Sequence, residues 1–190
     1  MPPEPTYIIP NTDLFSFLKK ASKNRLILSV FWISMFLFLL LFLRVFFKYD
    51  ISFLSRLKFT FYGFLIALLC IPLHEVIHYC TYKILGARDV KIEMFWKRGY
   101  IVTRANKFMV GKKEILPISI LPFLTISTAV GIILFFSSSP FSISIAAALL
   151  LHGSLCQSDF SILAYFFNDS KTKFMVEQFD ENMIQIYVNE

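Results

Sequence analysis

The sequence predicts an all-α polytopic membrane protein with about four transmembrane helices and a small cytoplasmic β-hairpin between helices two and three. Of the 190 residues, 56% are apolar, 23 are Phe and only 17% are charged, whereas about a quarter of a soluble domain is charged. Four apolar stretches each reach 18 residues or more, the length that a membrane-spanning helix needs. The three cysteines all lie in these stretches, so a disulfide scaffold is excluded, as are a disordered chain and a collagen.

The chain divides into three predicted parts. Residues 1–25, with early prolines and then a charged run, predict a cytoplasmic or interfacial segment in which Thr12 caps a short helix over residues 13–23. Residues 26–167 form the predicted four-span membrane domain. Residues 168–190 form a polar cytoplasmic tail, which ends in a predicted short strand over residues 183–188.

The four predicted spans differ in character. The first has no charged residue in 18 positions. The second contains Pro72 at its middle, where a proline removes a backbone hydrogen bond and predicts a kink. The spans are residues 26–43, 59–82, 115–136 and 141–167.

The segment between the second and third spans has a different pattern. Residues 90–96 alternate apolar and polar side chains in their first half, and residues 97–99 are typical of a turn. Residues 100–103 are all β-branched or aromatic. This succession predicts the β-hairpin.

Charged and histidine side chains occur in only two of the spans. The second holds the sequence His74-Glu75-Val76-Ile77-His78. Two histidines four residues apart project from the same side of a helix, about 40° apart and about 6 Å along its axis. That spacing suits two ring nitrogens that bind one zinc ion, with Glu75 as the general base that acts on a zinc-bound water. From the histidine and glutamate content, only about 0.002 accidental matches to this motif are expected.

The fourth span supplies the candidates for a third ligand, His152 and Asp159. A charged group at mid-bilayer costs roughly 2.5–3.5 kcal/mol, so it normally faces a partner, and a hydrolytic zinc site needs three protein ligands and an open position. The two candidates are separated by about 10 Å along a straight helix, so both cannot easily bind one ion. Counted from the cytoplasmic ends of the spans, Asp159 is level with His74 and His78, whereas His152 is deeper. Depth therefore favours Asp159 as the ligand, with His152 as a group behind the ligands or an alternative ligand.

A transmembrane HEVIH helix with an aspartate on a later transmembrane helix resembles the site-2 protease class of intramembrane metalloproteases. From about residue 71 to 188 the chain more closely resembles a putative bacterial membrane zincin peptidase family, catalogued as a domain of unknown function. The matching segments are HEVIHYCTYKILG, EILPISILPF, HGSLCQSDFSILAYFF and FDENMIQIYV. This resemblance implies that His74, His78 and Asp159 are zinc ligands and that Glu75 is the base.

The motif and the resemblance predict a zinc-dependent peptidase of the cell membrane, surrounded by lipid, that hydrolyses a membrane-associated peptide or protein. We expect the hairpin to take up an extended substrate as an added strand. The alternative is a zinc transporter or a metal-binding membrane protein without peptidase activity, because histidine and acidic residues in spans also mark ion pathways. The small number of histidines disfavours a transporter. Glu75 disfavours a purely structural site, which has no use for a base.

The basic residues predict the orientation. Four precede the first span, nine lie between the second and third spans, and two follow the fourth, so fifteen share one side of the membrane against four on the other. Cytoplasmic loops carry the excess of Lys and Arg. The sequence therefore predicts a multi-pass protein with both termini in the cytoplasm, and the net charge of +6 requires no nucleic-acid partner.

Reporter fusions test this orientation. A fusion at Ser138, in the turn between the third and fourth spans, is expected to report the outside, and one after Glu190 is expected to report the cytoplasm, because of the distribution of basic residues. A cytoplasmic signal at Ser138 would contradict the orientation but not the zinc site.

Overall fold

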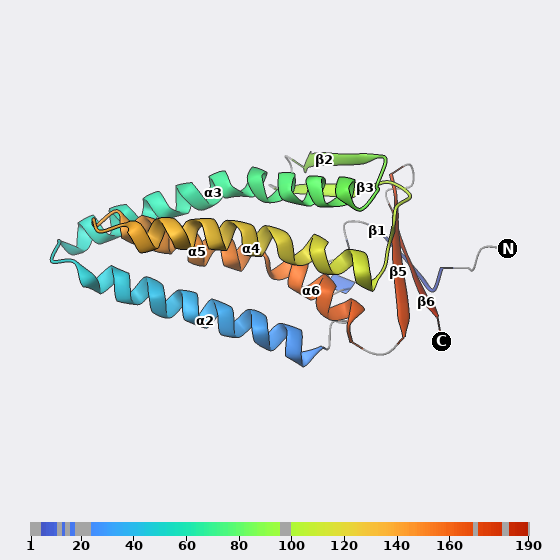
Figure 1. The fold of residues 1–190 in the computed structure, drawn as a ribbon, viewed down its shortest axis with the longest axis horizontal. Coiled ribbons are helices and arrows are strands. Elements are labelled where there is room, and N and C mark those ends of the chain that lie inside the picture. Colours follow the sequence, from blue (N-terminus) through green and yellow to red (C-terminus); the bar gives the residue numbers. More distant parts are fainter. Residues whose placement is uncertain are drawn as a thin grey trace.

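The computed structural model describes residues 5–10, 13, 16–17, 24–95, 100–168, 171–179 and 183–189. Long helices run side by side, and two small sheets lie at one end of them (Figure 1). The helices are α2 (Arg25–Lys48), α3 (Phe53–Ile84), α4 (Lys112–Phe136), α5 (Ser142–Leu155) and α6 (Gln157–Phe166). Among the described residues, four helical stretches are long and apolar enough to cross a membrane, with α5 and α6 counted as one. They coincide with the four predicted spans.

The first two helices extend beyond the predicted spans because polar residues cap them outside the apolar stretches. The Asn24 side chain accepts a hydrogen bond from the Ile27 N–H (3.2 Å), and the Ser52 hydroxyl accepts one from the Ser55 N–H (3.2 Å). Each cap satisfies a backbone donor that the first turn of a helix leaves free. The 32 residues of α3 span about 48 Å, against a hydrocarbon core of about 30 Å. α3 is therefore longer than a membrane span requires, and one of its ends lies beside the sheets.

The predicted fourth span over residues 141–167 is interrupted. α5 ends at Leu155 and α6 begins at Gln157, with Cys156 between them. The Cys156 N–H bonds the Gly153 carbonyl, three residues back, at 3.2 Å, which is the tighter pattern found at helix ends. Gly153 also weakens a helix locally because of its low helix propensity. The single straight helix assumed from the sequence is thus corrected to two helices.

The predicted hairpin is confirmed. β2 (Val90–Phe95) and β3 (Tyr100–Ala105) form an antiparallel two-stranded sheet in which Val90 pairs with Ala105. The predicted turn at residues 97–99 lies outside the described residues. So does the predicted helix over residues 13–23, apart from positions 13 and 16–17.

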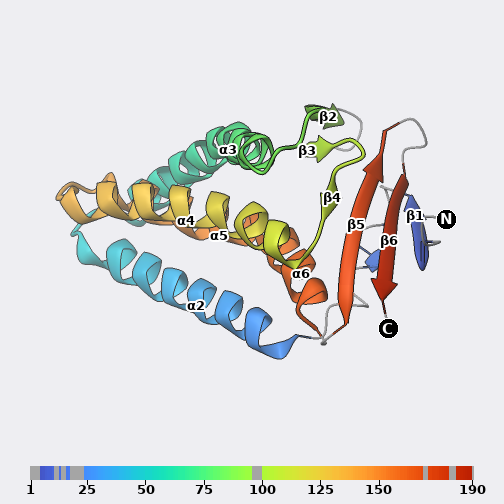
Figure 2. The same cartoon turned by 45° about the vertical axis from the view of Figure 1, so that its right-hand side comes forward.

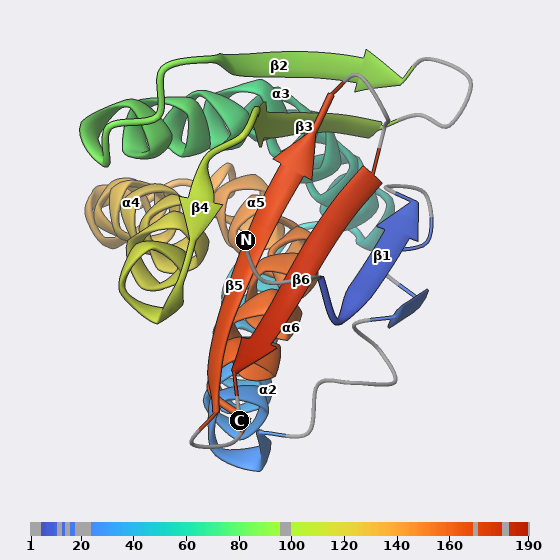
Figure 3. The ribbon, with the colours of Figure 1, turned by 90° about the vertical axis from the view of Figure 1, so that its right-hand side faces the viewer.

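A second sheet joins the two ends of the chain, and Figures 2 and 3 show it across the ends of the helices. Its order is β1 (Tyr7–Pro10), β6 (Met183–Asn189), β5 (Thr172–Gln178) and β4 (Met109–Val110), with antiparallel neighbours throughout. β6 confirms the strand predicted over residues 183–188. The fold is therefore mostly helical, as predicted, and the four-stranded sheet is an addition to the predicted helices and hairpin. Pairing between opposite ends of the chain gives no local sequence pattern that would predict it.

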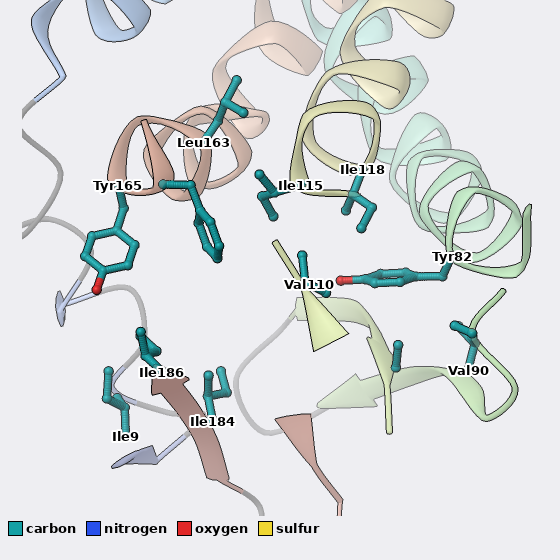
Figure 4. Close-up of a cluster of buried hydrophobic side chains, with 13 residues drawn as sticks. Ile9, Tyr82, Val90, Val110, Ile115, Ile118, Leu163, Tyr165, Ile184 and Ile186 are labelled. Atoms are coloured by element: carbon teal, nitrogen blue, oxygen red, sulfur yellow. The ribbon is translucent and has the colours of Figure 1, made fainter. Parts of the chain in front are cut away.

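A cluster of buried apolar side chains holds this sheet against the helices (Figure 4). Ile9 of β1 and Ile184 and Ile186 of β6 pack in one cluster with Ile115 of α4 and Phe166 of α6. All five are at most 7% exposed. Full burial of such a side chain stabilises a protein by about 1.5–3 kcal/mol. The sheet is therefore integral to the folded unit.

Farther from the sheets, α3 and α5 cross closely at Gly63. A Cβ atom at this position would lie 2.5 Å from the Ser144 carbonyl oxygen and 2.6 Å from the Ala147 Cβ. The Ser144 hydroxyl also donates a hydrogen bond to the Phe59 carbonyl across the crossing, at 2.7 Å. Small residues and interhelical hydrogen bonds of this kind hold membrane helices together.

We expect Gly63→Ala to destabilise the protein by about 1–3 kcal/mol, because the added methyl group has no room at this crossing. The matched control is Gly131→Ala, since nothing lies within 4 Å of a Cβ at Gly131. Thermal unfolding of the purified proteins in detergent measures the difference. Equal stability of the two variants would contradict the close crossing.

Candidate metal centre

α3 carries the motif residues on its buried side, toward the end that meets the sheets. His74, Glu75 and His78 are each 8% exposed. The four-residue spacing brings the Nε2 atoms of His74 and His78 to 2.9 Å from each other. The structure thus places the two histidines as the helical period predicts, with their ring nitrogens at one point beside the helix.

Asp159 reaches the same point from α6. Its Oδ2 atom lies 3.2 Å from Nε2 of His74, and its Oδ1 atom lies 3.6 Å from Nε2 of His78. The side chain is in the first turn of α6 and is 8% exposed as a residue. The structure therefore brings together the three residues that depth and resemblance favoured as ligands.

The chemistry of this cluster fits a zinc ion. Ligands at 2.0–2.1 Å around a tetrahedral zinc lie about 3.3 Å apart, and the three donor pairs here lie between 2.9 and 3.6 Å apart. Two imidazoles and one carboxylate are a common ligand set of catalytic zinc. Among the described residues, the buried Oε2 of Glu75 has no hydrogen-bond partner. A water molecule bound beside a cation in this cluster would satisfy that oxygen.

Glu75 is held by the hairpin as well as by its own helix. The Thr103 hydroxyl on β3 donates a hydrogen bond to the Glu75 backbone carbonyl at 2.8 Å, and Thr103 is buried. The sequence analysis did not single out Thr103. A threonine in a β-branched strand is ordinary, and no local pattern connects it with a helix 28 residues away.

Arg104, the neighbour of Thr103, ties the hairpin to the second sheet. It forms ion pairs with Glu93 on β2, at 2.7 Å, and with Glu177 on β5, and its guanidinium lies 4.8 Å from the centre of the Phe179 ring. Burial raises the pKa of the Glu177 carboxyl above its ordinary value, against the opposing effect of Arg104. A continuous set of contacts therefore runs from the Glu75 carbonyl through β3 to the sheet that holds both ends of the chain.

His152 lies at the other edge of the His74 ring. Its Nε2 atom is 3.4 Å from Nδ1 of His74. His152 belongs to α5 and Asp159 to α6, on either side of the interruption at Cys156. The two candidates thus approach opposite edges of the His74 ring. The Cys156 thiol lies 3.8 Å from both His74 Nδ1 and His152 Nε2.

A helix with two histidines four residues apart, a glutamate after the first and a carboxylate from a second helix has the composition of a zincin-type site. Residues 67–174 match the family described as putative zincin peptidase. The match covers more than half of the chain and includes every residue of the cluster, so the chain belongs to this family.

Membership of this family indicates a metallopeptidase and implies zinc. The search of curated proteins found no match, and the search of solved structures found none either. The distant resemblance to site-2 proteases stays a prediction.

The opposite positions of Asp159 and His152 around His74 predict different effects of substitution. We expect Asp159→Asn to weaken zinc binding by more than about 100-fold, because it removes a charged donor. We expect His152→Asn to weaken zinc binding by about 10-fold or less, as for groups that orient a ligand without binding the metal. Competition with a chelator, at no more than one zinc per chain, measures both affinities. Loss of zinc in His152→Asn and its retention in Asp159→Asn would reverse the assignment.

Proposed function

We propose that the protein is a zinc-dependent, membrane-embedded metallopeptidase that hydrolyses peptide bonds of a membrane-associated protein or peptide. The observation that carries the proposal is the convergence of His74, His78 and Asp159, from two helices of membrane-spanning character, beside the buried carboxylate of Glu75. Burying four ionisable groups together in such helices is costly unless they bind a cation. A general base beside that cation can take a proton from the water that attacks the peptide bond.

His74, His78 and Asp159 would hold the ion through Nε2, Nε2 and the carboxylate. Zinc, when bound, polarises a peptide carbonyl and makes a water molecule more acidic. Glu75 takes a proton from the attacking water and returns it to the leaving nitrogen, so one carboxyl group acts first as base and then as acid. Its freedom from hydrogen-bond partners at Oε2 among the described residues leaves that oxygen available for the water.

The hairpin supports an extended substrate. β3 lies against α3 at Glu75, through the Thr103 hydrogen bond of 2.8 Å, and in the described part of the chain β2 and β3 pair only with each other. A peptide must leave its helical conformation before a bond in it can be hydrolysed, and a strand edge is a common support for an extended peptide. We therefore assign the hairpin edge to the substrate.

Location in the cell membrane with both termini in the cytoplasm completes the proposal. Both sheets lie at the end of the helices where both chain ends are found (Figure 1), and the long loop with its nine basic residues begins and ends there. The metal centre is at the same end of α3. The proposed reaction therefore takes place toward the cytoplasmic side of the membrane.

Glu75→Gln separates binding from catalysis. We expect this variant to keep its zinc while its activity falls by about 10²–10⁴-fold, because the amide cannot take a proton from water. Zinc content and hydrolysis of fluorescently labelled casein, measured on the same purified sample in detergent, provide the comparison. His78→Asn is the matched control, which should lose both zinc and activity. Full activity of Glu75→Gln would refute the mechanism.

A further inference from the structure

We propose a second cation site, on the Nδ1 edge of His74, in which His74, His152 and Cys156 bind a soft d¹⁰ cation such as a second Zn²⁺. The site adds to the proposed function and shares His74 with it, but it uses other ligand atoms. Its predicted consequence is inhibition of the peptidase by excess metal, and that consequence rests on the proposed function.

The three donor atoms have the spacing that a cation requires. Nδ1 of His74 lies 3.4 Å from Nε2 of His152, and Sγ of Cys156 lies 3.8 Å from each of them. For three ligands in a plane around zinc, bond lengths of about 2.0–2.1 Å to nitrogen and about 2.3 Å to sulfur give separations of about 3.5 Å between nitrogens and about 3.8 Å between nitrogen and sulfur. The triangle matches a three-coordinate ion at its centre.

The site is more enclosed than the first. Cys156 is 0% exposed and His152 is 1% exposed, against 8% for Asp159. A buried site of nitrogen and thiolate ligands is typical of soft-metal binding, and its burial limits the access of a peptide substrate. The thiolate supplies a negative charge within the protein, where a cation would otherwise lack one.

The chain interruption creates this site. His152 lies in the last turn of α5 and Cys156 lies at the junction with α6, four residues apart as the two motif histidines are. The Cys156 thiol now donates to the His152 carbonyl at 3.3 Å, and His152 Nδ1 has no hydrogen-bond partner among the described residues. On binding, the thiol and His74 Nδ1 each release a proton, and the His74 ring bridges the two cations as an imidazolate.

The simpler arrangement is a hydrogen bond between His74 and His152 without any cation. It accounts for the 3.4 Å contact, and the thiol then keeps only its bond to the His152 carbonyl. Metal binding gives the thiol and both ring nitrogens one common partner, and thiolate ligation is directly visible by spectroscopy. The experiment below distinguishes the two arrangements.

The test is a titration of the full-length protein in detergent with Cd²⁺, whose bonds to thiolate absorb in the near ultraviolet. Cys70 and Cys80 are the other cysteines, so the double variant Cys70→Ser/Cys80→Ser serves as parent and control. We expect the parent to bind about two Cd²⁺ per chain and to show the thiolate band. Adding Cys156→Ser should remove the band and one Cd²⁺, and Cys156→Ala provides the same test if the serine variant does not fold.

Asp159→Asn in the same parent separates this site from the catalytic one. It should lose one Cd²⁺ and keep the thiolate band. If Asp159→Asn binds as much Cd²⁺ as the parent while Cys156→Ser still loses one ion, the proposed catalytic centre is wrong and the second site stands. A parent that binds one Cd²⁺ without a thiolate band overturns the second site, and the hydrogen-bonded arrangement is then correct.

Discussion

The contact of His74 and His78 on α3 with Asp159 on α6 is the constraint on which the arrangement of the helices depends. A charged group within a membrane span costs about 2.5–3.5 kcal/mol unless a partner meets it. The carboxylate links α6 to α3 through contacts of 3.2 and 3.6 Å, while α6 otherwise packs against α2 and α4. At the far end of α3, Gly63 lets α5 approach within the reach of a hydrogen bond. The two fixed points leave α3 little freedom to slide or rotate.

The second sheet extends this constraint beyond the helices. Arg104 binds carboxylates of both sheets, and its neighbour Thr103 bonds the Glu75 carbonyl. The chain ends, paired as β1 and β6, are therefore connected to the proposed base through a short series of buried polar contacts. Polar contacts of low exposure help to hold one geometry. The candidate metal centre is therefore supported by contacts from both sheets as well as by the helices.

The sequence predicted the parts of the structure that depend on local periodicity. The helical period places His74 beside His78, and a fixed rise per residue places Asp159 at the same depth, so simple counting sufficed. The alternation of side chains likewise predicted the hairpin. The pairing of Tyr7 with Ile186 and the bond from Thr103 to Glu75 depend on residues far apart in the chain, which no local pattern links. The interruption at Cys156 was not predicted, because residues 141–167 were taken as one continuous span, although residues 152–159 read HGSLCQSD.

The interruption separates the two elements whose side chains contact the two ring nitrogens of His74. A straight helix has one line of side chains toward α3, and His152 and Asp159 would then occupy different depths on it. With the helix divided, Asp159 approaches His74 Nε2 at 3.2 Å and His152 approaches Nδ1 at 3.4 Å. One edge of the ring faces a carboxylate and an imidazole, and the other faces a thiol and an imidazole. Because oxygen ligands suit harder cations and sulfur ligands suit softer ones, the same ring would join the candidate metal centre to the proposed second site, with a different metal preference on each edge.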